Sequence, residues 1–310
     1  MPKLKILAAI LLLAVPGFAV ADLSDAGVPD SSTWYLHVDL EEMRTSPAGS
    51  KLYAWLDDEV ISELREETGI DIGKEVDQIT AFSAPGAGVV VLIEGTVSQE
   101  SQDKLLALAA VADELQTLKF KRNTYYYIEG DGSSEGNGHR HGKIEIDSFD
   151  NGVYFSFALK NRIIITSTPE EMESLLASNG KIKKRSNPSG TLFVLTAEKS
   201  LMQAGLRPDE FEAGGGWESN ILRNAEHVAM MIADIAGKLA VEVRLVTREA
   251  DMAQSLASIL RGLISLMAFD DDMEPGVAEA LRSTKVVVED RALTIKVALS
   301  PDLVVAALKD

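Results

Sequence analysis

Apolar residues recur with two different periods along this chain, and each period predicts one kind of secondary-structure element. Between residues 238 and 246, Val241, Val243 and Leu245 alternate with Glu242 and Arg244. Successive side chains of a strand point to opposite faces of its sheet, so this period of two predicts a strand with one solvated face. Strands of this kind are typical of antiparallel sheets.

Other segments place apolar residues every three or four positions, which is the period of an α-helix. Leu52, Leu56, Val60 and Leu64 repeat in this way, and Gly69 is predicted to end their helix. Ser46 and Pro47 are expected to start this helix. Further helices are expected near residues 98–115, near residues 247–269, and after Thr168-Pro169.

Three blocks of this pattern occur twice in the same order. Residues 33–40 correspond to residues 191–197, residues 78–97 to residues 227–246, and residues 161–177 to residues 290–308. In the second block the offset stays at 149 through both strands and their turn. A matched order of three blocks predicts an internal repeat, and a missed repeat would mis-assign the whole fold.

The repeat predicts an α+β protein made of two tandem copies of a β-α-β-β-α-β-β-α unit, with mainly antiparallel sheets and helices packed on one face. The first copy is expected over residues 22–180 and the second over residues 191–310. A basic, polar linker ending in Pro and Gly is expected between them, at residues 181–190. The pattern leaves open whether the two sheets are continuous or form separate lobes.

The N-terminus has the layout of an export signal. Lys3 and Lys5 precede an apolar run over residues 6–15, and small residues in an Ala-x-Ala arrangement end at Ala21. This order of charge, apolar core and small-residue site predicts a signal peptide over residues 1–21. The apolar run is shorter than the roughly 20 residues that span a bilayer, so an uncleaved anchor is the weaker alternative. The expected location is the bacterial periplasm or the exterior, with no stable membrane insertion after cleavage.

Composition excludes several kinds of chemistry. The chain has no cysteine, which rules out thiol catalysis, thiolate metal sites and disulfides, so apolar burial must hold the fold together. Its formal charge is −18, which opposes binding to nucleic acid and to anionic surfaces. Solubility accounts for this charge, and attraction to cations or to a basic partner is the alternative.

No motif of a known active site occurs. The sequence lacks a G-x-S-x-G motif, a P-loop, a dinucleotide glycine fingerprint and an H-E-x-x-H pair. His37 and His227 fall in predicted strands and are interpreted as ordinary packed or surface residues. The sequence therefore predicts no catalytic residue and no cofactor, and enzymatic activity is disfavoured without being excluded.

One loop has an unusual composition. Residues 129–142 are rich in glycine and contain Asp131, Glu135, His139 and His141. These four side chains could together bind a divalent cation, since imidazole and carboxylate groups are common ligands. The alternative is a flexible extension of a hairpin, because glycine and serine disfavour a fixed geometry.

The helix around residues 252–269 lacks the charged outer face that surface helices usually carry. A groove for a helix, a peptide or a lipid chain would be lined by its apolar residues, namely Met252, Leu256, Ile259, Leu260, Leu263 and Met267. The alternative is a central helix that the other repeat covers.

The run of residues 68–80, which follows Val38-Asp39-Leu40 and Arg44-Thr45-Ser46-Pro47, resembles a pattern of exported bacterial proteins of unknown function. Those proteins are similar to this chain in signal peptide, length and repeated strand-helix layout. The resemblance implies no activity and no functional residues.

Together these patterns favour a non-enzymatic periplasmic module that binds or interacts with an unidentified envelope protein. A carrier of an apolar ligand beside the helix of residues 252–269 is one alternative, and a hydrolase without a recognisable motif is another. Nucleic acid is not an expected partner.

Overall fold

A computed structural model describes residues 23, 26–30, 32–83, 88–112, 115–129, 152–199, 225–267, 273 and 275–309. The chain divides into two compact units, each built from segments that are not contiguous in sequence. One unit contains Val28–Leu40 and Asp57–Lys184, and we call it the seven-strand unit. The other contains Glu41–Leu56 and Arg185–Asp310 with the residues up to Gly27, and we call it the five-strand unit.

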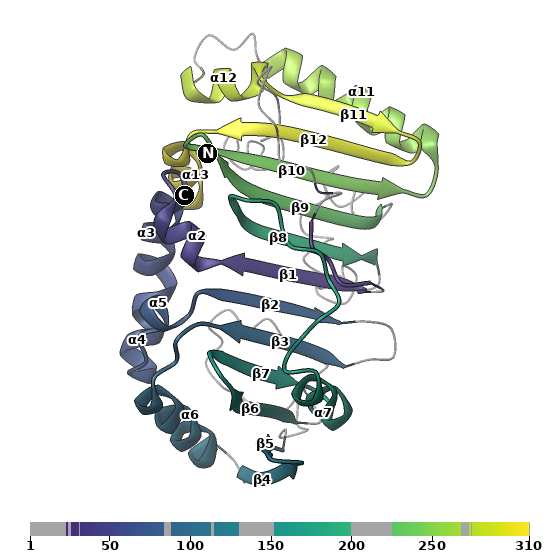
Figure 1. Cartoon of the computed structure of the whole chain (residues 1–310). Coiled ribbons are helices and arrows are strands. Elements are labelled where there is room, and N and C mark those ends of the chain that lie inside the picture. Colours follow the sequence, from purple (N-terminus) through teal and green to yellow (C-terminus); the bar gives the residue numbers. More distant parts are fainter. Residues whose placement is uncertain are drawn as a thin grey trace, which may run out of the picture. The chain divides into compact units, whose positions relative to one another are not determined.

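The described strands of the seven-strand unit form antiparallel pairs in the order β1-β2-β3-β7-β6-β5-β4. Their bounds are β1 Trp34–Asp39, β2 Gln78–Ser83, β3 Val89–Glu94, β4 Leu115–Phe120, β5 Asn123–Ile128, β6 Val153–Leu159 and β7 Arg162–Thr166. The helical segments are η2 Asp57–Ile61, α4 Ser62–Thr68, α5 Ile72–Glu75, α6 Gln99–Ala112 and α7 Pro169–Ala177. Figure 1 shows α7 beside β6 and β7, the two strands that it contacts.

The described strands of the five-strand unit are also antiparallel, in the order β11-β12-β10-β9-β8. Their bounds are β8 Thr191–Glu198, β9 Ala225–Ile235, β10 Lys238–Thr247, β11 Lys285–Glu289 and β12 Ala292–Leu299. The helices are α2 Leu40–Thr45, which begins where the chain passes from one unit to the other, α3 Gly49–Leu56, α11 Ala250–Met267, α12 Pro275–Arg282 and α13 Pro301–Lys309. Helix α11 contacts β10, β11, β12 and α12 (Figure 1).

An apolar cluster in the seven-strand unit packs β3 and β7 against α7. Val90 and Leu92 of β3 and Ile164 of β7 meet Met172 and Leu175 of α7 there. Thr168 fixes the start of α7, because its hydroxyl accepts a hydrogen bond from the amide of Glu171 and Pro169 occupies the first turn. The predicted start of this helix is confirmed.

Polar contacts explain why the segment Glu41–Leu56 belongs to the five-strand unit. The carboxylate of Asp234, at the end of β9, accepts hydrogen bonds from the amide of Ala48 at 2.6 Å and from that of Gly237 at 2.9 Å. Farther along α3, Lys51 pairs with Asp302 of α13. The carboxyl group of Asp234 thus holds both the start of α3 and the β9–β10 turn.

The general α+β class with large antiparallel sheet structure is as predicted, but the element order of the seven-strand unit is richer than the predicted eight-element unit. The helix expected over residues 98–115 ends at Ala112, and Leu115 begins β4. The hairpin β4–β5 was not predicted. Leu115 and Leu118 continue the helical spacing of Leu108 and Ala112 by chance, so periodicity did not mark the boundary.

The helix predicted to run from Ser46 to Gly69 is interrupted. It consists of α3, the π-helical segment η2 and α4, and it ends as predicted at Gly69, whose φ of 68° is left-handed. The hydroxyl of Ser46 accepts a hydrogen bond from Gly49 at the start of α3. The end of this helix at Gly69 was therefore predicted correctly, whereas its start lies at Gly49 and not directly after Ser46. The apolar spacing did not indicate the change of helical pitch.

The constant offset of 149 does not survive in the pairing of the strands. Ser83 pairs with Val89 across residues 84–88, whereas Ile235 pairs with Lys238 across Ala236 and Gly237 alone. Both Ala236 and Gly237 have positive φ, as the tight two-residue hairpin requires. The two hairpins therefore have turns of different length, although their sequences align at a constant offset.

The prediction of a solvated face on β10 is wrong at Glu242. This side chain is only 3% exposed, and its carboxylate pairs with Lys296 of β12 at 3.1 Å and accepts a hydrogen bond from the amide of Leu23 at 3.2 Å. A buried carboxylate is tolerated because these partners replace water. Neither partner lies near Glu242 in sequence, so local alternation could not reveal the burial.

Candidate interaction surface

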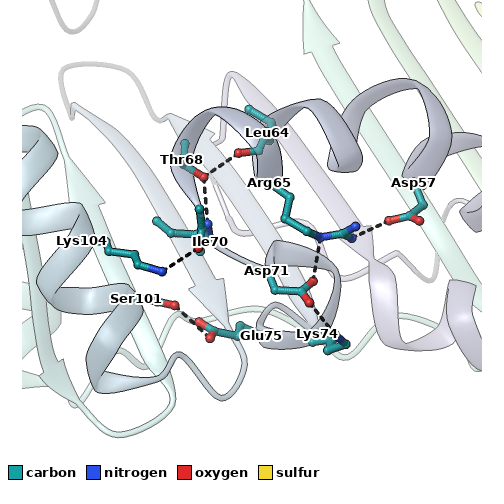
Figure 2. A network of polar contacts seen from close by, with 11 residues as sticks. Asp57, Leu64, Arg65, Thr68, Ile70, Asp71, Lys74, Glu75, Ser101 and Lys104 are labelled. Carbon is teal, nitrogen blue, oxygen red and sulfur yellow. Dashed lines mark hydrogen bonds and ion pairs between the residues drawn. The ribbon is translucent and has the colours of Figure 1, made fainter.

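A network of polar contacts joins α4 and α5 to the segment before them (Figure 2). The guanidinium of Arg65 donates to Asp57 at 2.9 Å and to Asp71 at 3.2 Å, and Lys74 donates to Asp71 at 2.7 Å. The Lys74 hydrogen bond, together with the charge of Arg65, holds the pKa of Asp71 below its ordinary value. These groups are accessible to solvent, so their ion pairs contribute little to the free energy of unfolding and mainly fix the conformation of the segment.

The same network caps the N-terminus of α6. The carboxylate of Glu75 accepts hydrogen bonds from the hydroxyls of Ser98 at 2.8 Å and Ser101 at 2.9 Å, and Ser98 also accepts from the amide of Ser101. Lys104 donates to the carbonyl of Gly69 at 2.9 Å. A carboxylate at a helix N-terminus is favourable. The N-terminal half of α6 is therefore anchored by polar contacts (Figure 2).

The C-terminal half of α6 has the opposite character. Residues 105–112 contain no charged side chain and no hydroxyl or amide side chain. Leu108 is 47% exposed and Val111 is 88% exposed. Among the α6 residues whose burial is described, Ser101 alone is buried. This helix end is wholly apolar, and even its Leu105, Leu106 and Ala109 are only half-buried, so its exposed side chains mark this surface as a candidate site.

Helix α11 presents a second surface of this kind. It buries Ala253, Ala257 and Leu260, while Ile259 is 54% exposed and Leu266 is 72% exposed. Of the six residues predicted to line a groove, Leu260 is buried and Ile259 is exposed, and Met252, Leu256, Leu263 and Met267 are half-buried. Leu260 and Ile259 thus lie on different faces of the helix, and Leu266, which the sequence reading omitted, is the most exposed apolar residue of α11.

The two surfaces occupy matching places in the connectivity of their units. Helix α6 follows the hairpin β2–β3, and α11 follows the hairpin β9–β10. The apolar character of α11 was predicted from the sequence, whereas that of α6 was not. The uninterrupted run Leu105-Leu106-Ala107-Leu108-Ala109-Ala110-Val111-Ala112 was the available signal.

The histidines in strands do not form a catalytic arrangement within the described residues. The Nδ1 atom of His37 lies 2.9 Å from the hydroxyl of Thr80, and its ring stacks at 6.3 Å from that of Tyr35. Burial, aided by the charge of Lys184, lowers the pKa of His37 to about 4. His227, on β9, is half-buried and belongs to the other unit, and burial lowers its pKa as well.

The proposed metal ligands Asp131, Glu135, His139 and His141 lie outside the described residues. Within the described part of the chain, no three His, Asp or Glu side chains are placed to share a metal ion. No helix in that same part combines the length and apolar character needed to cross a membrane.

These features define an α+β protein with large antiparallel sheet structure and two helix surfaces that expose apolar side chains. No protein-family model matches the chain, and no curated protein matches its sequence. The fold is similar to that of the protein TP0453 in its crystal form III, with a TM-score of 0.50 at 10% sequence identity over 91% of this chain and 95% of that chain.

Crystal forms I and IV of TP0453 are also similar, each with a TM-score of 0.45. Form I is 8% identical over 89% of this chain and 92% of that chain, and form IV is 9% identical over 93% and 98%. At such identity the likeness concerns the fold alone.

Proposed function

We propose that this chain is an exported, non-enzymatic interaction module that binds an envelope protein through the apolar ends of α6 and α11. The observation that carries the proposal is Val111, which is 88% exposed at the end of a charge-free helical run. Burying one such Val or Leu side chain against a partner contributes about 1.5–3 kcal/mol. A few of them can therefore supply much of a binding free energy without any catalytic group.

Charge supports a protein partner over other classes. A chain with a formal charge of −18 is repelled by nucleic acid and by anionic lipid surfaces. The outward residues of α11 are instead uncharged or apolar, apart from Asp251 near its start and Arg261, whose guanidinium donates to the carbonyl of Val286. Uncharged patches surrounded by charge are typical of protein–protein contacts.

We also propose that the two units descend from one duplicated unit. The strand order β1-β2-β3-β7-β6 of the seven-strand unit corresponds to β8-β9-β10-β12-β11 of the five-strand unit, in sequence rank and in the sheet. The hairpin β4–β5 then is an addition to one copy. Two surfaces on equivalent helices would give the module two related contact points.

Replacing Val111 by aspartate should abolish partner binding while leaving the fold intact. Val111 lies in the last turn of α6, where a negative charge opposes the helix dipole by about 0.3–1 kcal/mol, so the melting temperature should fall by no more than about 4 °C for a chain of this size. Asp103→Asn, a change at an exposed position in the polar half of the same helix, is the control. A loss of binding in V111D alone, with no larger fall in melting temperature, is the expected result.

A photo-reactive amino acid at position 111 identifies the partner in the native cell envelope. We expect one discrete protein adduct from position 111 and none from position 103. An adduct to lipid would replace this proposal with the apolar carrier. If position 111 gives no adduct in cells where the protein is active, the helix surface is not the site and a hydrolase without a motif becomes the leading reading.

A further inference from the structure

The N-terminal segment that follows the expected cleavage site is fitted into the five-strand unit. Leu23 is buried, and its amide donates to the Oε2 atom of Glu242 at 3.2 Å. Lys296 lies 3.1 Å from the same oxygen. Glu242 is itself only 3% exposed, so a charged acceptor has been placed in the interior where this segment meets β10 and β12.

Two further contacts fix the segment on its downstream side. The amide of Gly27 donates to the Oδ1 atom of Asn187 at 2.7 Å. A Cβ atom at Gly27 would lie 2.1 Å from the carbonyl oxygen of Arg185, so no other residue could approach the backbone this closely. Ala26 is buried, and its amide donates to the carbonyl of Leu23. The contacts of Leu23, Ala26 and Gly27 therefore fix these three residues against the five-strand unit.

Leu23 lies only two residues after the last residue of the expected signal peptide. Cleavage after Ala21 leaves Asp22 as the single residue before Leu23, and creates a positively charged α-amino group there. Covalent geometry keeps that group within about 4 Å of the amide nitrogen of Leu23. Because the amide of Leu23 lies 3.2 Å from the Oε2 atom of Glu242, the new positive charge is close enough to the carboxylate for the two to attract.

Before cleavage, the same position is an uncharged peptide bond. We propose that Glu242, Lys296 and Asn187 form a docking site for the processed N-terminus, so that removal of the signal peptide adds a charge interaction that stabilises the five-strand unit. This inference rests on the proposed export and is independent of any partner of α6 and α11.

Three purified chains test the site in vitro. One begins at Asp22, one begins with Gly-Ser-Gly-Ser before Asp22, and one begins at Val28. We expect the chain that begins at Val28 to melt more than about 5 °C below the chain that begins at Asp22, and the extended chain to melt between them. Equal melting of the chain from Asp22 and either other chain would overturn the proposal.

The Glu242→Gln substitution tests whether the carboxylate recognises the new terminus. In that background the difference between the exact and the extended chain should vanish, as a double-mutant cycle requires for two groups that interact. Glu226→Gln, which removes an exposed carboxylate on the neighbouring strand β9, should leave the difference in place. A difference that persists in E242Q would show that Glu242 is not the receptor.

Gly27→Ala keeps the test valid if the chain from Val28 does not fold. This change should lower the melting temperature of the chain from Asp22, because the added methyl group meets the Arg185 backbone. Gly262→Ala, at a helix position with no atom within 4 Å of the added methyl group, is the matched control and should not lower it. Equal melting of the two variants would contradict the docking geometry.

N-terminal sequencing of the envelope protein separately checks the export proposal, since Met1 at the terminus would refute cleavage without bearing on the melting data.

Discussion

Replacing Ile164 by alanine should lower the free energy of unfolding by about 3–4 kcal/mol. Ile164 of β7 is completely buried in the cluster that joins β3 to α7, where it is grouped with Leu92 and Met172. Truncation of such a side chain removes its transfer free energy and leaves a cavity that a sheet packed against a helix cannot close. The midpoint and slope of a urea unfolding curve give the measurement.

The next residue along the strand provides the control. Ile165 points to the opposite face of the sheet and is only half-buried. Ile165→Ala should cost about 1 kcal/mol, because half of its surface stays in water in both states. Similar losses for the two variants would mean that α7 does not define the buried face of this sheet.

Acidification should destabilise the protein through His37 over a defined range of pH. The pKa of His37 is about 4 in the folded chain against an ordinary 6.5, chiefly because the ring is buried. The unfolded chain therefore binds the proton first, so stability is complete above pH 6.5 and is lost as the pH falls toward 4. The full loss is about 3 kcal/mol, because a tenfold difference in proton affinity between the folded and unfolded chains corresponds to about 1.4 kcal/mol.

The variant His37→Asn isolates this effect. Asparagine retains a polar partner for Thr80 and carries no proton in this range, so its free energy of unfolding should change much less between pH 6.5 and 4. His227→Asn serves as the comparison, because His227 is less buried and lies in the other unit. If the pH slope of H37N matched that of the unaltered protein, burial of His37 would not be its cause.

Elements whose signals are local were predictable from the sequence. Thr168 and Pro169 start α7, Gly69 ends α4, and Asn161 turns the β6–β7 hairpin with a positive φ. Each of these residues acts on backbone atoms within a few positions of itself. The nearby sequence therefore determines each of these features, and residue type and spacing are enough to predict them.

Features that depend on distant partners were not predictable. Glu242 was assigned to a solvated face because nothing nearby in sequence indicates Lys296 or Leu23. The apolar surface on α11 was visible in the sequence as a lack of charge. The uninterrupted apolar run of α6 is also visible, but a buried helix can have the same run, and the structure was needed to show that Val111 faces solvent.

The hydrogen bond from Arg261 to the carbonyl of Val286 bears on the tendency of this protein to aggregate at high concentration. Strand β11 is the last in its described order, and it consists of three valines between Lys285 and Glu289. Short β-branched segments with exposed backbone groups are the usual seeds of fibril growth. The guanidinium of Arg261 donates to one backbone carbonyl of this strand. We expect this hydrogen bond to compete with an incoming strand for that acceptor.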